Sequence, residues 1–227
     1  QGRLIILLAF FTLGCMAVRA QDDPQYRMEI GAGVGVMTYE GDFNGNVLSD
    51  MQPAGFLVGR YNFDPYKDLK LSVGFGKIKG SSANVDTFYP DYAENPYCFN
   101  HTLVDMNLVF EYNFWPYGTG RDYRGAQRLV PYILGGLGAT YVKGNEKNVF
   151  TANVPLGIGA KYKVNERLNL GLAWTFHFSL SDELDGVKDP YWVKSSGIFK
   201  NTDCYSTIAV SVTYSFSAKC KTCNKEE

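Results

Sequence analysis

Residues 168–180, LNLGLAWTFHFSL, alternate strictly between apolar side chains and small or polar ones. Successive side chains of a β-strand point to opposite faces, so every second residue of this segment shares one face. One face is continuously apolar and consists of Leu168, Leu170, Leu172, Trp174, Phe176, Phe178 and Leu180. The opposite face holds only Asn, Gly, Ala, Thr, His and Ser, which are too small and polar to build an ordinary protein core. This pattern limits the all-β folds that the chain can adopt.

Two other segments repeat the pattern. The apolar face of residues 103–115 is Val104, Met106, Leu108, Phe110, Tyr112 and Phe114, and that of residues 205–216 is Ile208, Val210, Val212, Tyr214 and Phe216. Five further strands are expected at residues 26–40, 52–63, 68–79, 129–142 and 152–164, and the phase of the segment 129–142 is ambiguous. Strands of about 10 to 14 residues have the length with which a tilted strand crosses a bilayer.

The charged residues distinguish a membrane barrel from a soluble sheet fold. A soluble sandwich buries its apolar faces between two sheets and carries its charges outside. Here the face opposite the apolar one is mostly small and polar and also includes Glu29, Arg60, Asp105, Glu111 and Lys161. Inside a closed barrel these charges would pair in a narrow polar lumen, while the apolar face meets lipid. We therefore predict an all-β fold, an eight-stranded antiparallel transmembrane β-barrel with both termini in the periplasm. A β-sandwich and a lipocalin-like soluble barrel are the alternatives.

The connections between the expected strands fit this topology. Small outer-membrane barrels have short periplasmic turns and longer external loops. The two longest connections, residues 80–101 and 181–203, fall on the external side. On the periplasmic side only the connection at residues 116–128 is long, and it carries Arg121, Arg124 and Arg128. An aromatic girdle is expected near the periplasmic ends of the strands, formed by Tyr112, Phe114, Trp115, Tyr117 and Tyr132.

The N-terminal segment has the pattern of a secretory signal peptide. Arg3 precedes the apolar run LIILLAFFTLG, and Ala20 precedes the polar stretch QDDPQ. A lipoprotein signal ending at Cys15 is the alternative. The expected organisation is a signal peptide at residues 1–20, a barrel at 21–217 and a periplasmic tail at 218–227.

Four cysteines remain after such a cleavage, in a chain that has left the cytoplasm, so disulfides are permitted. They are Cys98, Cys204, Cys220 and Cys223, and the sequence leaves their pairing open. Cys98 and Cys204 adjoin the long external loops and could form a bridge. Cys220 and Cys223 lie in a Lys-rich tail, where a local or inter-chain disulfide is favoured over a redox or zinc site.

The segment 168–180 also contains the strongest indication of an enzyme. His177 and Ser179 resemble the His-x-Ser pair of an outer-membrane lipid A deacylase family, whose strand motif is Phe-x-His-x-Ser-Asn with a downstream Glu. Here Phe176 directly precedes His177, and Leu180 replaces the Asn. Both reactive side chains fall on the lumen face, and Glu183, the nearest acid, lies in the adjoining loop. We therefore predict no catalytic site.

Other chemistry finds little support in the sequence. The balance of 22 Lys+Arg against 23 Asp+Glu gives no basic excess for binding nucleic acid. The acids at 182, 183, 185 and 189 lack the spacing of an EF-hand calcium loop. Only two histidines are present, which excludes a His-rich metal site. No cofactor, metal or small-molecule substrate is expected.

The mature chain as a whole resembles a Bacteroidetes family of small outer-membrane barrels, the PorG-like proteins of the type IX (Por) secretion system. The resemblance rests on the early strand MEIGAGVGVMTYEGDF, on the segment NVPLGIGAKYKVNERLNLGLAW and on the turn into SDELDGV. In that turn, Glu183 and Gly186 depart from the family pattern. The resemblance implies a non-enzymatic barrel whose periplasmic side associates with the lipoprotein PorK and, through it, with the PorK/PorN ring.

Partner contacts are expected at Arg121, Arg124, Arg128, Cys220 and Cys223. These residues lie on the periplasmic side, in a connection and a tail that are not needed to close the barrel. An eight-stranded barrel has an interior just wide enough for side chains, so the chain is not expected to be a conduit for folded cargo. One alternative is a surface adhesin or recognition barrel that acts through residues 80–101 and 181–203, whose Tyr and acid content suits protein contacts. A lipid A deacylase-like enzyme is the other alternative.

Overall fold

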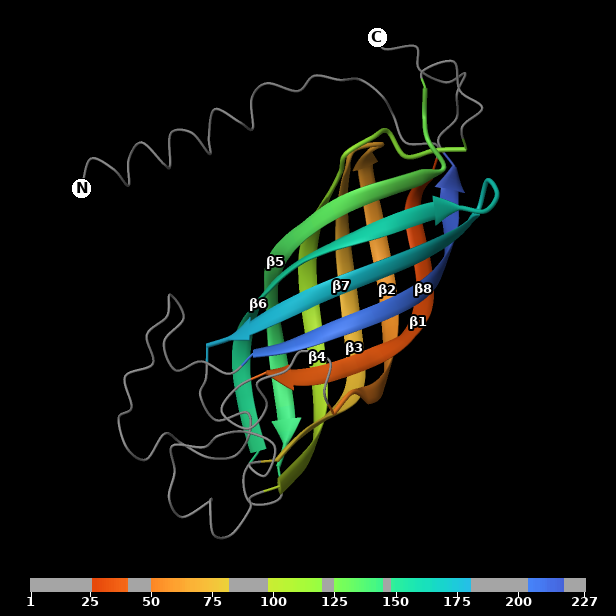
Figure 1. The fold of residues 1–227 in the computed structure, drawn as a ribbon. Helices are drawn as coiled ribbons and strands as arrows, with labels where there is room; N and C mark the ends of the chain where they lie inside the picture. The colour runs from red at the N-terminus through yellow and green to blue at the C-terminus, as the bar shows by residue number, and fades with distance from the viewer. Residues whose placement is uncertain are drawn as a thin grey trace, which may run out of the picture.

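The structure, a computed structural model, describes residues 26–40, 50–81, 98–119, 125–144, 148–180 and 204–218. In these ranges the chain forms eight β-strands (Figure 1). They are β1 (Tyr26–Glu40), β2 (Gln52–Asp64), β3 (Lys67–Ser81), β4 (Cys98–Asn113), β5 (Leu129–Lys143), β6 (Asn148–Lys163), β7 (Leu168–Ser179) and β8 (Cys204–Ala218). All eight predicted strands are confirmed. No helix in the described ranges is long and apolar enough to cross a membrane.

The strands form one closed antiparallel barrel in sequence order. Each strand pairs with the next along the chain, and β1 closes the ring by pairing with β8, for example at Glu29 opposite Ser215. Closure gives every strand a hydrogen-bonded neighbour on both sides, so the sheet has no open edge. The predicted eight-stranded antiparallel barrel is therefore confirmed.

The two ends of the barrel differ in their connections. The first residue of β1 and the last residue of β8 lie at one end, together with the connections at 65–66, 114–128 and 164–167; we call it the termini end (Figure 1). The other four connections, at 41–51, 82–97, 144–147 and 180–203, lie at the opposite end, which we call the loop end. The two longest connections, 82–97 and 180–203, therefore belong to the loop end, as predicted.

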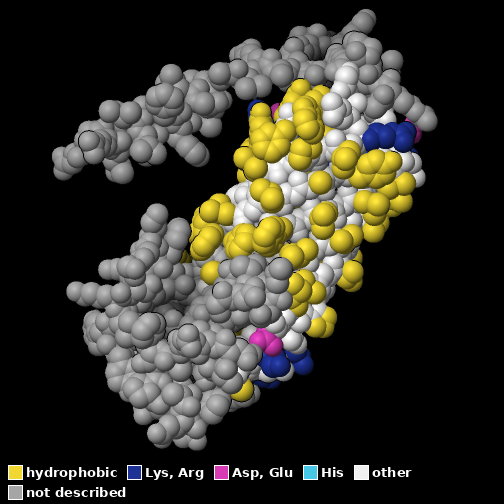
Figure 2. All heavy atoms as spheres, in the orientation of Figure 1, with side chains coloured by type: hydrophobic (Ala, Val, Ile, Leu, Met, Phe, Trp, Pro, Cys, Tyr) yellow, Lys and Arg dark blue, Asp and Glu magenta, His cyan; other side chains and the backbone are white. Residues whose placement is uncertain are grey.

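The exterior of the barrel is apolar on every strand. Exposed outward-facing side chains include Ile30, Leu57, Phe75, Leu108, Leu137, Ile158, Leu172 and Val212, one from each strand in order. Val34 and Leu137, near the middle of β1 and β5, are 72% and 70% exposed. Figure 2 shows apolar side chains over much of the visible wall and charged ones near its two ends. The predicted division between an apolar outer face and an inner face is confirmed, and β5 takes the phase with Leu137 outward.

The lumen is polar only in part. In the half nearer the loop end, buried apolar and aromatic side chains pack into a small core: Met37, Tyr39, Ala54, Ile78, Phe99, Leu103, Val142, Val149 and Tyr205. This core explains why β4 begins at Cys98 rather than near residue 103, since Phe99 packs inward against Tyr39 with their rings 5.1 Å apart. The lumen, predicted to be narrow and polar, therefore also contains an apolar core in this half.

Candidate functional site

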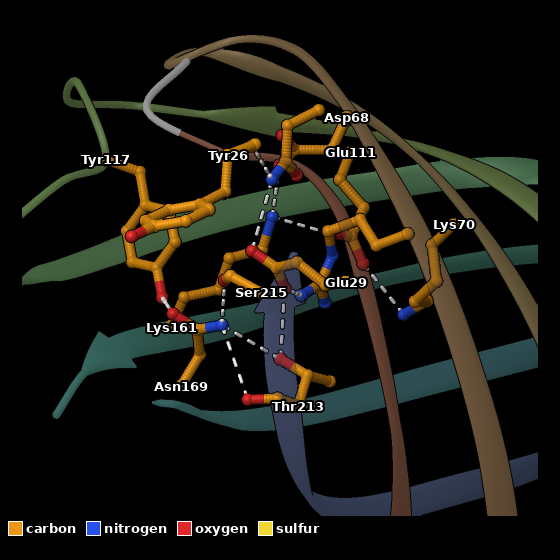
Figure 3. A network of polar contacts seen from close by, with 12 residues as sticks. Tyr26, Glu29, Asp68, Lys70, Glu111, Tyr117, Lys161, Asn169, Thr213 and Ser215 are labelled. Carbon is orange, nitrogen blue, oxygen red and sulfur yellow. Dashed lines mark hydrogen bonds and ion pairs between the residues drawn. The ribbon is translucent and has the colours of Figure 1, made fainter. Parts of the chain in front are cut away.

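Charged and amide side chains fill the half of the lumen nearer the termini end, and Glu111 of β4 is their hub (Figure 3). Arg60 Nε of β2 donates to Glu111 Oε2 at 2.9 Å, and Lys161 Nζ of β6 lies 2.6 Å from the same oxygen. Lys70 Nζ of β3 lies 2.8 Å from Glu111 Oε1. Arg60 Nη1 also lies 2.5 Å from Glu29 Oε2 of β1. One carboxylate thus ties three other strands to β4, and Arg60 extends the network to β1.

The buried charges of the described lumen balance one another. Four carboxylates and four cations are buried there: Glu29, Asp68, Asp105, Glu111, Arg60, Lys70, Lys161 and Lys163. Lys161 pairs with Asp68 as well as with Glu111, and it donates to Asn113 Oδ1 at 3.1 Å. A buried charge is costly unless it is paired and hydrogen-bonded. The network meets that requirement, and it blocks the lumen with interlocked side chains.

Most of the predicted lumen charges meet in this network. Glu29, Arg60, Glu111 and Lys161 do so, whereas Asp105 lies apart and accepts a hydrogen bond from Tyr205 at 2.9 Å. Sequence reasoning missed three further charges of the lumen, Asp68, Lys70 and Lys163. The alternation of faces along a strand could have identified them, because each lies an even number of residues from an inward-facing position of the same strand.

The described parts of the segment 114–128, residues 114–119 and 125–128, contact the opening of the barrel at the termini end. Tyr117 N donates to Pro65 O of the β2–β3 turn at 3.0 Å. The two described arms of the segment also bond to each other, because Gly118 N donates to Gln127 O and Gln127 N donates to Pro116 O. The described arms, residues 114–119 and 125–128, are therefore hydrogen-bonded to the barrel end and to each other.

Tyr117 is the side chain that this segment inserts into the opening (Figure 3). Its hydroxyl donates to Asn169 Oδ1 at 3.0 Å, and Lys161 and Lys163 lie 5.9 Å and 5.1 Å from the centre of its ring. Burial, together with the Glu29 carboxylate, raises the pKa of Tyr117. The hydroxyl therefore stays protonated and keeps donating at physiological pH. The Tyr117 side chain therefore fills the opening on the termini-end side of the ionic network, and we call it the Tyr117 plug.

Of the predicted partner-contact residues, the structure describes Arg128. It is exposed at the termini end, where its Nε donates to Thr119 O at 2.8 Å and thereby links the two arms of the segment 114–128. Arg121, Arg124, Cys220 and Cys223 lie outside the described residues, as do the expected signal peptide and the tail beyond Ala218.

The aromatic girdle is only partly as predicted. Tyr112, Phe114 and Trp115 are exposed on the outer surface near the termini end. Tyr132, however, is 2% exposed and faces the lumen, where Lys161 Nζ lies 4.6 Å from its ring centre. Tyr117 also points into the opening, as described above. The ambiguous phase of β5 explains the error at Tyr132.

A small cavity lies in the middle of the lumen, between the apolar core and the ionic network. Its volume is about 50 Å³, and Arg60, Asp105, Asn107 and His177 are among the residues that line it. This volume is enough for a few water molecules, which need about 10–15 Å³ of such space each, and far too small for a peptide. The cavity in the described part of the lumen can therefore hold water, and it is too small for a peptide.

His177 and Ser179 face the lumen, as the phase of β7 predicted. The His177 ring stacks on Tyr205 with ring centres 4.4 Å apart and planes 2° from parallel. His177 Nε2 lies 3.3 Å from Thr207 Oγ1, and Ser179 Oγ donates to Thr151 Oγ1 at 3.5 Å. The two side chains therefore have separate partners in the lumen and face away from the surface where acyl chains would lie.

Cys98 and Cys204 are not joined by a disulfide. The bridge considered between them is thus wrong for this structure, and the strand order gives the reason. They begin β4 and β8, which lie on opposite sides of the ring of eight strands. A disulfide requires Cα atoms within about 7 Å of each other. Within the described ranges, no group of three or more His, Cys, Asp and Glu side chains is arranged to hold a metal ion.

The sequence matches, over residues 4–225, the family described as "Domain of unknown function (DUF6089)". This chain belongs to the DUF6089 family. The match covers all eight strands of the barrel, so the family unit includes the whole lumen and the segment 114–128. A search of curated proteins finds no match to this DUF6089 protein.

Several solved structures are similar to the DUF6089 barrel. OprG from Pseudomonas aeruginosa has 12% identity and a TM-score of 0.49, with 87% of this chain and 99% of that chain covered. Ail of Yersinia pestis, in complex with the heparin analogue sucrose octasulfate, has 11% identity and a TM-score of 0.49, with 85% and 100% covered. Neisserial surface protein A has 12% identity and a TM-score of 0.46, with 83% and 97% covered. Values this low say nothing of function, and the barrel is assigned here from its own strand pairing.

Proposed function

We propose that this DUF6089 protein is an integral outer-membrane barrel with its termini end in the periplasm. The observation that carries the proposal is the inverted distribution of side chains: large apolar groups cover the exterior of every strand, while paired charges fill the interior. Exposing such an apolar exterior to water would be unfavourable. In a membrane the same side chains contact hydrocarbon instead of water, which is favourable. The first residue of β1, the last residue of β8 and the two short turns at 65–66 and 164–167 lie at one end, which matches the periplasmic side of small bacterial barrels.

Within that membrane, the protein serves as a non-enzymatic component of the type IX secretion machinery that anchors the periplasmic PorK/PorN ring. The blocked lumen favours anchoring over transport, since salt-bridged side chains and the apolar core fill it. The resemblance to PorG-like proteins supplies the partner. Two of its sequence segments lie mainly on β1 and on the β6–β7 hairpin, and the third, SDELDGV, lies outside the described residues. The hydrogen-bonded arms at 114–119 and 125–128 lie on the side that would face PorK.

Crosslinking in intact cells, followed by recovery of the barrel, tests this role. We expect the tagged wild-type protein to recover PorK, and PorN through it. A variant that lacks residues 219–227 and has Arg121, Arg124 and Arg128 changed to Gln should recover much less, provided that it still folds. Equal recovery by the two proteins would show that these residues do not bind the partner, and recovery of neither PorK nor PorN by wild type would reject the role itself.

A surface recognition barrel is the second candidate. It is favoured by the length of the connections at 82–97 and 180–203, which a barrel with a rigid apolar core at the loop end would display outside the cell. The two functions depend on opposite ends of the protein. Replacing residues 82–97 by a short Gly-Ser linker should leave recovery of PorK unchanged in the anchoring role, and should abolish binding to host or cell surfaces in the recognition role.

A further inference from the structure

A groove at the rim of the termini end has two arginines among its lining residues. It runs along the β6–β7 turn from the segment 114–128 to the outer face of β8. Its lining residues are Thr119, Arg128, Val164, Asn165, Glu166, Arg167, Leu168 and Tyr214, and its volume is about 650 Å³. Val164 and Tyr214 also belong to the exposed exterior of the barrel, at 37% and 46% exposure. The groove therefore joins the charged end of the barrel to its apolar wall.

Arg167 is held in place by neutral aromatic partners. Its Nη1 donates to Tyr214 Oη at 2.8 Å, and its guanidinium carbon lies 5.9 Å and 6.0 Å from the ring centres of Tyr26 and Tyr214. Cation–π contacts of this kind orient a guanidinium without neutralising it. The side chain is nevertheless exposed, so its remaining N–H groups can reach a ligand.

Arg128 is fixed in a similar way from the other side of the groove. Its Nε donates the hydrogen bond to Thr119 O. The two terminal nitrogens of the guanidinium can therefore donate to a ligand. Neither Arg128 nor Arg167 forms an ion pair within the described ranges of the chain. Among the described lining residues, two hydrogen-bonded guanidinium groups thus stand against a single carboxylate, that of Glu166.

We propose that this groove binds the phosphate of a glycerophospholipid from the adjacent leaflet, with Arg128 and Arg167 as its ligands. Guanidinium groups match the oxygens of a phosphate in geometry and charge, and two of them against one carboxylate leave a net charge of +1 for a phosphodiester. Val164, Leu168 and the Tyr214 ring line the same groove and can contact the glycerol and the first methylenes. This inference rests on the proposed outer-membrane location, because only there does a leaflet meet this rim.

Lipid is favoured over an acidic protein segment because of where the groove opens. Tyr214 and Leu168 continue the outward rows of β8 and β7, whose other members form the apolar exterior. Tyrosine rings at such a boundary lie at the level of lipid headgroups. When the headgroup of a lipid is bound there, the acyl chains of the same lipid lie against the apolar wall of the barrel. A soluble partner has no such chains with which to cover this wall.

Native mass spectrometry of the full-length barrel in detergent micelles tests the proposal, with phosphatidylglycerol, diacylglycerol and inorganic phosphate as separate probes. We expect phosphatidylglycerol to bind more tightly than the uncharged diacylglycerol. Arg128→Ala and Arg167→Ala should each weaken its binding about tenfold, the effect of losing one charge-assisted hydrogen bond. Arg27→Ala is the matched control, because Arg27 is an exposed arginine at the same end but outside the groove. The Arg27→Ala variant should bind phosphatidylglycerol as tightly as the wild-type protein does.

Three results would overturn the proposal. They are unchanged lipid binding in both groove variants, an equal loss in Arg27→Ala, and competition by inorganic phosphate at the same concentration as lipid, which would indicate a site for free anions. Displacement of the lipid by a Glu-rich peptide at lower concentration would assign the groove to a protein partner instead. A gel that separates folded from heat-unfolded barrel confirms that each variant is folded. Because the assay reads the groove directly, it is independent of PorK recovery and of membrane location in cells.

Discussion

Arg60 on β2 and Glu111 on β4 form a buried ion pair across the strand between them, with Nε 2.9 Å from Oε2. Glu111 is also the shared partner of Lys70 and Lys161, so removing its charge leaves three cations with too few carboxylates. We predict that Glu111→Gln lowers the free energy of unfolding by about 3–5 kcal/mol, the usual result of breaking a buried pair from one side. Urea unfolding of the barrel in lipid vesicles measures the change.

The control for Glu111→Gln is Asp64→Asn. Asp64 lies 3.5 Å from Lys67 in a partly exposed pair at the β2–β3 turn, and such pairs contribute about 0–1 kcal/mol. Its substitution should leave the unfolding midpoint nearly unchanged. Equal effects of the two substitutions would mean that the lumen network does not stabilise the barrel.

Closure of the ring depends on a close approach of β1 to β8. A Cβ added at Gly31 would lie 2.0 Å from Val212 O, whereas a Cβ at Gly55 would meet nothing within 4 Å. Gly31→Ala should therefore destabilise the barrel by about 1–3 kcal/mol, as overpacking does, while Gly55→Ala has little effect or stabilises slightly. The same unfolding titration compares the two. A harmless Gly31→Ala would contradict the described pairing of β1 with β8.

The Tyr117 plug should hold the segment 114–128 against the barrel end. Tyr117→Ala removes both the hydrogen bond to Asn169 and the ring beside Lys163, and Tyr117→Phe removes only the hydrogen bond, which is worth about 1 kcal/mol. Hydrogen exchange at the amides of residues 117 and 118 should accelerate strongly in the first variant and modestly in the second. Tyr112→Phe, on the outer wall, is the control and should leave both amides protected.

The strands and their faces could be predicted from sequence because apolar and polar side chains alternate with a period of two in most of them. Leu170, Leu172 and Trp174 all point outward as predicted, and the inward charges Glu29 and Glu111 were found by their phase. The pattern is blurred in β5, where three glycines between Leu134 and Ala139 carry no side chain to mark a face. Tyr132 was consequently assigned to the exterior.

The lumen partners could not be predicted from the sequence. Which charges meet depends on the stagger of all eight strands, and the pairing of Arg60 with Glu111 skips a strand. The apolar core near the loop end was missed because Phe99 and Leu103 lie where strand and loop patterns merge. The fold of 114–128 depends on backbone bonds to Pro65 and Gln127, which leave no periodic signal.

If the barrel lies in a membrane, the free-energy cost of placing a charged residue on its outer wall should depend on the depth of that residue in the bilayer. Leu137→Arg, at the middle of β5, should destabilise the barrel in vesicles by about 2–4 kcal/mol, whereas Phe150→Arg, near the loop end of β6, should cost about 0–1 kcal/mol. Both side chains are similarly exposed, at 70% and 74%, so a difference in cost reflects their depth rather than their exposure. Unfolding titrations in vesicles measure both. Equal, small costs would indicate a wall that faces water.

Antibody binding to intact cells tests the central claim, an outer-membrane barrel with its loop end outside and its termini end in the periplasm. One variant carries an epitope tag within residues 82–97, between β3 and β4, and the other carries it after residue 227. We predict that intact cells bind the antibody through the first tag only, and that the second becomes accessible when the outer membrane is permeabilised. Accessibility of the C-terminal tag alone, or of neither tag until the cells are lysed, would contradict the account.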